Sequence, residues 1–215
     1  MQSLLLLYYS LRSVILRGLG YSLKMVASES KYEKRIGIDT IKFKRSESVD
    51  FFHYQGASYL VLDRIFRELE DYRDFRFTDI GSGKGRVAFM AEHNGFRDIV
   101  GIELDQTLYQ ESLQNLSLHR QKFPESKIKF FNSNALDYHY EDQKTVYFLF
   151  NPFSGRILEQ FIRKVLAETK SETVFVYMNP RFAGVFTKMG LKSDETIKTR
   201  FYTEALIYKR TQMSS

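Results

Sequence analysis

Apolar positions along residues 75–209 follow two alternating periods. Short continuous apolar runs are typical of buried strands, whereas apolar residues that recur every three or four positions are typical of one face of a helix. The runs predict strands at 75–80, 99–104, 127–132, 145–150 and 173–178. Helical spacing predicts helices at 55–70, 85–94, 106–122, 156–168 and a short one at 182–189. Two final strand-like runs follow, at 191–199 and 203–209.

This alternation of strands and helices predicts a parallel sheet with helices on both faces. The last two runs are joined by a few residues, too short for a parallel crossover, so they must form an antiparallel hairpin. We therefore predict an α/β fold: a doubly wound, mostly parallel seven-stranded sheet with a C-terminal antiparallel hairpin and an N-terminal helical extension.

The first 20 residues show helical spacing of apolar side chains, at Leu4, Leu7, Leu11, Val14 or Ile15, and Leu19. The spacing predicts an amphipathic helix, and two interpretations stay open: a helix docked on the domain, or a helix that contacts a membrane surface or a partner. Arg12 and Arg17 would suit anionic lipid in the second case. The apolar run at 4–9 is too short to span a bilayer. Residues 24–50 are polar and weakly periodic, which predicts a linker with irregular or short strand structure.

The amino-acid composition excludes several kinds of functional site. The chain has no cysteine, so disulfides, thiolate metal sites and a cysteine nucleophile are excluded. Its four histidines are scattered without metal-ligand spacing, and we expect no metal.

Charge divides the chain in two. Residues 1–45 contain nine basic and three acidic residues, which accounts for the whole net charge of +6. We predict a basic amphipathic extension at 1–50, one folded domain at 51–210 and a tail at 211–215. The extension could recruit an acidic protein, RNA or a membrane face. The expected location is cytoplasmic, with peripheral membrane association as an alternative, because no secretory signal is evident.

Residues 77–86 read Phe-Thr-Asp-Ile-Gly-Ser-Gly-Lys-Gly-Arg, directly after an apolar run and before a helical pattern. Three alternating glycines let backbone approach a ligand closely. Glu103 follows Gly85 by 18 positions, at the end of the next apolar run. A glycine loop followed by an acid at this distance predicts a nucleoside site in a Rossmann-like sheet. Arg86 stands where a dinucleotide fingerprint has its third glycine, so a nicotinamide-dependent oxidoreductase is the weaker alternative.

The order of motifs over residues 50–210 resembles the class I S-adenosylmethionine-dependent methyltransferases. The resemblance implies S-adenosylmethionine as the cofactor. Glu103 would take the ribose hydroxyls, with Asp105 as its alternative, and Asn134 would meet the adenine edge, with Asp137 as its alternative. Tyr54 could close over the methionine portion or could simply be core. The implied cofactor-binding residues are Asp79, Gly81, Ser82, Gly83, Gly85, Glu103, Asn134, Ala135 and Tyr54.

Asn151-Pro152-Phe153 ends a predicted strand and resembles the acceptor motif of this family, but it lacks the second proline. In the full motif an amide oxygen and a backbone carbonyl accept hydrogen bonds from a target amine, and the aromatic ring stacks on the acceptor. The resemblance therefore makes Asn151, Pro152 and Phe153 the catalytic candidates; a merely structural proline at the strand end is the alternative. Asn179-Pro180 ends the next strand and is interpreted as structural.

The predicted function is methyl transfer from S-adenosylmethionine to an acceptor nitrogen of a protein lysine, a nucleic-acid base or a small molecule. The alternative is a non-catalytic scaffold or binding protein that keeps the methyltransferase fold.

Overall fold

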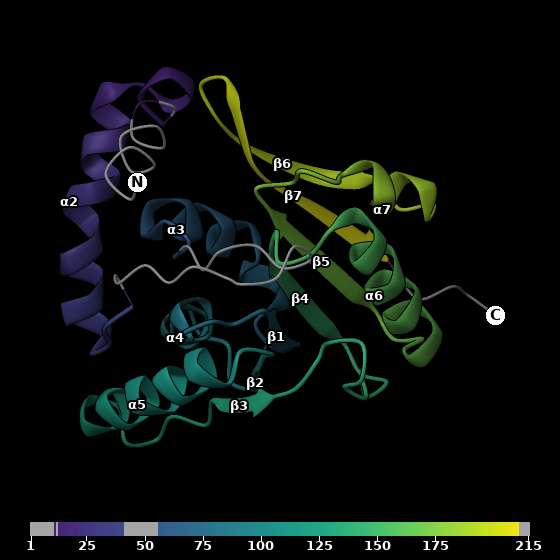
Figure 1. Cartoon of the computed structure of the whole chain (residues 1–215), viewed down its shortest axis with the longest axis horizontal. Helices are drawn as coiled ribbons and strands as arrows, with labels where there is room; N and C mark the ends of the chain where they lie inside the picture. The colour runs from purple at the N-terminus through teal and green to yellow at the C-terminus, as the bar shows by residue number, and fades with distance from the viewer. Residues whose placement is uncertain (1–10, 12, 41–55, 211–215) are drawn as a thin grey trace.

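The computed structural model describes residue 11 and residues 13–40 and 56–210. A seven-stranded sheet runs through its centre in the order β3-β2-β1-β4-β5-β7-β6 (Figure 1). Its strands are β1 Arg76–Ile80, β2 Ile99–Glu103, β3 Lys129–Asn132, β4 Thr145–Phe150, β5 Thr173–Met178, β6 Ser193–Thr199 and β7 Tyr202–Arg210. The first five strands are parallel, and β7 pairs antiparallel with both β5 and β6. The predicted fold class is confirmed.

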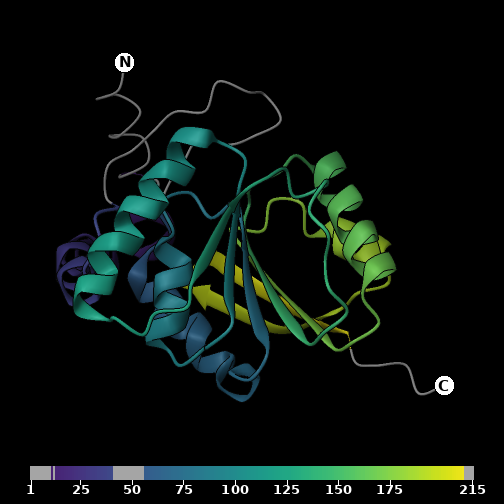
Figure 2. The same ribbon diagram turned by 90° about the horizontal axis from the view of Figure 1, so that it is seen from below.

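Helices cover both faces of the sheet, as the edge-on view in Figure 2 shows. One layer contains α3 (Tyr59–Glu68), α4 (Arg86–His93) and α5 (Gln106–Lys122), and η1 (Glu70–Tyr72) is a short 3-10 turn that follows α3. The other layer contains α6 (Gly155–Glu168) and α7 (Gly184–Lys188). The N-terminal helix α2 (Leu19–Ile36) packs outside α3 and α4.

The central strands β4 and β5 supply the middle of both cores. Successive side chains of a strand point to opposite faces. Accordingly, Val146 and Phe148 join the cluster under α3, α4 and α5, whereas Tyr147 and Leu149 join the cluster under α6. Because both faces are covered, the strand has to be apolar at nearly every position, which is why its sequence is a continuous apolar run.

The terminal hairpin places its second strand inside the sheet and its first strand at the edge. Most side chains of β6 are exposed, whereas β7 contains buried residues such as Ala205 and Ile207. The more apolar strand therefore takes the inner position beside β5. The two strands meet at a tight connection in which Arg200 adopts a positive φ of 51°.

The prediction of a linker at 24–50 is wrong for residues 24–36, which belong to α2. The helix ends at Gly37, whose φ of 81° makes it a left-handed C-cap. Its inner face contains Tyr32 and Ile36 but also two acids, Glu29 and Glu33, that pair with Arg86. Apolar periodicity predicts only helices that bury an apolar face. Because much of the buried face of α2 is polar, the sequence pattern did not predict a helix here. The remainder of the predicted linker, 41–50, lies outside the described residues, as do 1–10 and the tail at 211–215.

Within the described part of the chain, no helix combines the length and the apolar character that crossing a membrane requires.

Candidate functional site

The glycine loop joins β1 to α4 at the carboxyl end of the central strands. Gly81, Gly83 and Gly85 have φ values of 72°, 54° and 88°, in the left-handed region that side chains other than glycine's rarely adopt. There is also little room for a side chain at these positions. A Cβ atom on Gly81 would lie 2.9 Å from Cβ of Pro152, and one on Gly85 would lie 2.5 Å from Cζ of Phe130. The loop therefore needs glycine for both its backbone conformation and its close packing.

Glu103 ends β2 and is fastened directly to this loop. Its Oε2 accepts a hydrogen bond from the backbone N–H of Gly83 at 2.7 Å, and its Oε1 accepts one from the backbone N–H of Asp105 at 2.8 Å. The side chain is buried, and burial raises the pKa of its carboxyl group. Each carboxylate oxygen has further acceptor capacity. Two oriented oxygens beside backbone N–H groups are suited to a pair of ligand hydroxyls.

Asp79 lies on β1 just ahead of the loop and is buried. Within the described residues, its Oδ2 atom has no hydrogen-bond partner. Burial and the nearby charge of Glu103 raise the pKa of this carboxyl group to about 8. A buried polar atom without a partner is costly, and a buried carboxylate needs either a proton or a cation. Ser82, inside the loop, also has a buried hydroxyl oxygen without a partner among the described residues.

The segment after β3 lies next to Glu103, because the backbone N–H of Ser133 donates to the Glu103 carbonyl at 3.0 Å. Asn134 follows, and its Oδ1 accepts from the backbone N–H of Leu136 at 2.9 Å. Ala135 is buried, and its carbonyl accepts from the Tyr140 hydroxyl at 2.8 Å. The amide oxygen of Asn134 thus helps to fold its own turn, which leaves its NH₂ as the better group for a ligand.

Asn151 and Pro152, at the end of β4, touch the glycine loop through the close approach of Pro152 to Gly81. Asn151 has a positive φ of 44° and is only 3% exposed. Its Oδ1 accepts a hydrogen bond from the Tyr177 hydroxyl at 2.7 Å. The Tyr177 oxygen in turn accepts from the backbone N–H of Phe182 at 3.3 Å. The structure therefore brings the predicted acceptor segment and the predicted cofactor loop together.

Phe153 differs from this picture. It is 5% exposed, and its ring centroid lies 5.8 Å from that of Phe161 on α6. In this conformation the ring is part of the core rather than a surface for an acceptor. Stacking by Phe153 stays a prediction that requires the ring to leave this contact. The other aromatic candidate, Tyr54, lies outside the described residues.

Two residues that matter here were not predicted from the sequence. Tyr177 orients Asn151, and its signal was a hydroxyl within an otherwise apolar strand, since a buried tyrosine hydroxyl needs a partner. Arg86 is the first residue of α4 and is buried. Its guanidinium pairs with Glu29 at 2.5 Å and Glu33 at 3.3 Å, and it lies 4.4 Å from the ring centroid of Tyr59. Arg86 therefore ties α2 to the start of α4, directly after the glycine loop.

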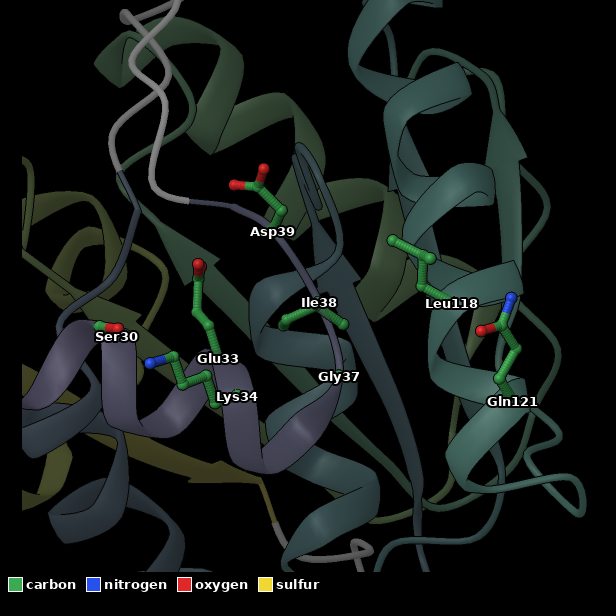
Figure 3. A pocket seen from close by; sticks show the side chains of 8 residues that line it. All are labelled: Ser30, Glu33, Lys34, Gly37, Ile38, Asp39, Leu118 and Gln121. Atoms are coloured by element: carbon green, nitrogen blue, oxygen red, sulfur yellow. The ribbon is translucent and has the colours of Figure 1, made fainter.

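A hollow of about 460 Å³ lies between the end of α2 and α5 (Figure 3). Its lining residues are Ser30, Glu33, Lys34, Gly37, Ile38, Asp39, Leu118 and Gln121. None of these belongs to the glycine loop or to the acids beside it. The hollow is therefore separate from the candidate site.

Comparison with known proteins gives a match at the level of structure. No family model matches the sequence, and no curated protein matches it. Among solved structures, a protein from Pyrococcus horikoshii described as a possible RNA methyltransferase superposes with a TM-score of 0.59. It is 13% identical, and the match covers 86% of this chain and 100% of that one. The chain has the class I methyltransferase fold.

Two further structures with this methyltransferase fold hold a ligand. An RNA methyltransferase from Salinibacter ruber, in complex with S-adenosyl-L-homocysteine, has a TM-score of 0.53 and 17% identity over 75% of this chain and 95% of that chain. The magnesium protoporphyrin IX methyltransferase from Synechocystis, with bound S-adenosylmethionine, has a TM-score of 0.52 and 12% identity over 73% and 85%. At these identities the similarity establishes the fold, and the site has to be argued from its own residues.

Proposed function

We propose that this protein is an S-adenosylmethionine-dependent methyltransferase with a nitrogen acceptor. The observation that carries the proposal is the pair of buried acids, Asp79 and Glu103, behind a glycine loop with positive φ angles. S-adenosylmethionine supplies an electrophilic methyl group on a sulfonium and also carries an ammonium group. The unpartnered Oδ2 of Asp79 needs a proton or a cation, and a cationic ligand would supply the second.

The residues around the loop fit the other parts of such a ligand. Glu103 accepts hydrogen bonds from both ribose hydroxyls, because the backbone N–H groups of Gly83 and Asp105 already orient its two oxygens. The loop Gly81–Gly85, including Ser82, lies against the ligand through its backbone. Asn134 donates from its NH₂ to the adenine edge, and Ala135 packs beside it. Tyr54 keeps its predicted role over the methionine portion.

Asn151 and Pro152 form the acceptor side. The amide oxygen of Asn151, held by the Tyr177 hydroxyl, has a second lone pair that can accept from an acceptor N–H. Holding the N–H in this way orients the nitrogen lone pair, and orientation of two reactants contributes several kcal/mol to such reactions. Bound S-adenosylmethionine would supply the methyl group: the methyl–sulfur bond would break as the acceptor nitrogen bonds to the methyl carbon, and the neutral thioether S-adenosylhomocysteine would leave. The nitrogen would then lose its proton to solvent. A protein lysine, a nucleic-acid base and a small-molecule amine all meet this requirement.

Calorimetric titration with S-adenosylmethionine and its demethylated product tests cofactor binding. We expect heat from the wild-type chain and none from Gly83→Arg, whose side chain would fill the cradle. A folded wild-type chain that gives no heat with either ligand would overturn the proposal, and tight binding of NAD instead would favour the oxidoreductase.

A radiolabelled methyl-transfer assay on lysate, separated into protein, nucleic acid and small molecules, identifies the acceptor class. Burial of Phe153 supports one alternative, a scaffold that binds the cofactor without catalysis. Binding without label transfer in any fraction is the result that this alternative requires.

A further inference from the structure

Exposed apolar side chains gather on one region of the surface, the outer side of the N-terminal helical segment and the tip of the β6–β7 hairpin. Nine large apolar side chains of the described residues are exposed, and six of them lie in this region. They are 58 to 75% exposed: Leu11, Ile15, Leu19, Leu23, Val26 and Phe201. We call this set the apolar patch. Such a concentration marks a contact surface, because scattered single side chains would need no explanation.

The patch is assembled from two segments that are far apart in sequence. Leu19, Leu23 and Val26 are spaced by four and three residues, so they share one side of α2. The hairpin tip lies beside the short helical segment that precedes α2, where the backbone N–H of Phe201 donates to the Leu16 carbonyl at 3.2 Å. Figure 1 shows the tip next to the start of α2.

The charged side chains around the apolar patch are basic. Lys24, Lys31, Lys34 and Arg35 are exposed on α2, and Arg200 is exposed at the hairpin tip. No acidic residue precedes Glu29 in the sequence. The two acids of α2, Glu29 and Glu33, face inward and pair with Arg86. The outer side of the helix therefore combines apolar and cationic groups without an anion.

The inner contacts fix this helix to the domain and correct one sequence-based interpretation. Arg17 was a candidate for lipid contact, but its guanidinium pairs with the buried Glu204 at 2.6 Å and lies over the Tyr202 ring. It belongs to the docking contact. The docked interpretation of the N-terminal helix therefore holds for its inner side, and the outer side is open.

We infer that the apolar patch binds the surface of an anionic phospholipid membrane. Apolar side chains on the outer side of a helix enter the acyl boundary of a bilayer, and flanking lysines and arginines are attracted to anionic headgroups. A second copy of this chain would have to place its own cationic patch against this one, which the uniform charge disfavours.

Vesicle flotation of the full chain tests the inference. We expect it to bind vesicles of phosphatidylcholine mixed with phosphatidylglycerol, to bind phosphatidylcholine alone much less, and to be released by salt. The triple variant Leu19→Ser, Leu23→Ser, Val26→Ser should lose at least about tenfold in affinity, because it removes three apolar side chains that the membrane would bury. Lys31→Gln should lose about fivefold on anionic vesicles only.

Leu118→Ser is the matched control, because this leucine is also exposed on a helix but lies outside the patch. It should bind vesicles like the wild type. Circular dichroism and cofactor titration of each variant separate loss of lipid binding from loss of fold or of the proposed activity. Absence of flotation with anionic vesicles would overturn the inference. So would a wild-type dimer in analytical ultracentrifugation that the triple variant dissociates, because a second copy would then cover the patch.

Discussion

Two neighbouring strands, β4 and β5, end in the same local motif, an asparagine followed by a proline. Asn151 and Asn179 both adopt positive φ, 44° and 52°. In both, the amide oxygen accepts from a tyrosine hydroxyl of the next strand in the sheet, Tyr177 for Asn151 and Tyr202 for Asn179. The hydrogen bond to the neighbouring strand holds each asparagine in a conformation that is unfavourable for most side chains.

The two strand ends differ in what they face. β4 pairs with β1, so the proline after Asn151 touches Gly81 of the glycine loop. β5 is one strand further away, and the backbone N–H of Asn179 donates to the backbone carbonyl of Glu204 on β7. The same sequence motif therefore lies at the candidate site in one case and in a structural corner in the other. Position in the strand order, not the motif, separates the two.

Replacing each asparagine is the strongest test of this difference. Asn151→Ala should reduce methyl transfer at least about 100-fold, because the group that orients the acceptor is lost. Asn179→Ala should stay within about threefold of the wild-type rate. Both should lower the free energy of unfolding by about 1 kcal/mol, since alanine fits positive φ poorly. Initial rates of label transfer and thermal melting measure these effects; equal activity losses would mean that the two ends do not differ in function.

The second prediction concerns Asp79, at the same edge of the sheet, and the pH dependence of stability. Its folded pKa of about 8 lies above its ordinary value of 3.8, so the folded apo protein binds more protons and its stability falls as pH rises between these values. Asp79→Asn should therefore melt higher than the wild type at pH 8 while binding S-adenosylmethionine about 10- to 100-fold more weakly.

Binding itself should depend on pH in a matching way. A cationic ligand favours ionised Asp79, so wild-type affinity should rise from about pH 6 to about pH 7.5, with proton release, and the affinity of Asp79→Asn should stay flat. Calorimetry in buffers of different ionisation enthalpy measures both quantities. A wild-type affinity independent of pH would mean that Asp79 does not face the ligand's charge.

The two tyrosines give a smaller and more selective contrast. Tyr177→Phe removes the hydroxyl that orients Asn151 and should lower the transfer rate about tenfold, with little change in cofactor affinity. Tyr202→Phe removes the equivalent hydrogen bond at Asn179 and should change stability by about 1 kcal/mol without slowing transfer. Rates at saturating cofactor and urea denaturation distinguish the two; the same slowing in both would contradict the assigned roles.

Two glycine substitutions test the contact between the glycine loop and Pro152. Gly81→Ala combines a φ of 72° with a 2.9 Å approach to Pro152, whereas Gly190→Ala has a φ of 79° and open space. Both should lose about 1 kcal/mol for backbone strain, and Gly81→Ala should lose more and weaken cofactor binding. Urea denaturation and calorimetry provide the measurements. Identical stability losses would show that the contact between the loop and β4 is loose.

The sequence by itself determined the alternation of elements, the parallel sheet and the closing hairpin. These follow from local periodicity and from short connections, and α5, β4 and β5 have the predicted bounds. It also indicated which strand ends carry polar side chains, including Asp79, Glu103 and Asn151. Three alternating glycines at a strand end leave few other conformations.

Only the tertiary structure decided which of these side chains meet. Asn151 and Tyr177 are 26 positions apart and become partners because β4 and β5 are neighbours in the sheet. Helix α2 escaped prediction because its docking face includes two acids that pair with Arg86, a pairing that periodicity cannot reveal. Phe153 is buried against Phe161 in this conformation, a contact that local spacing could not reveal either. Apolar spacing records that a side chain is buried, whereas its partner depends on how distant segments pack.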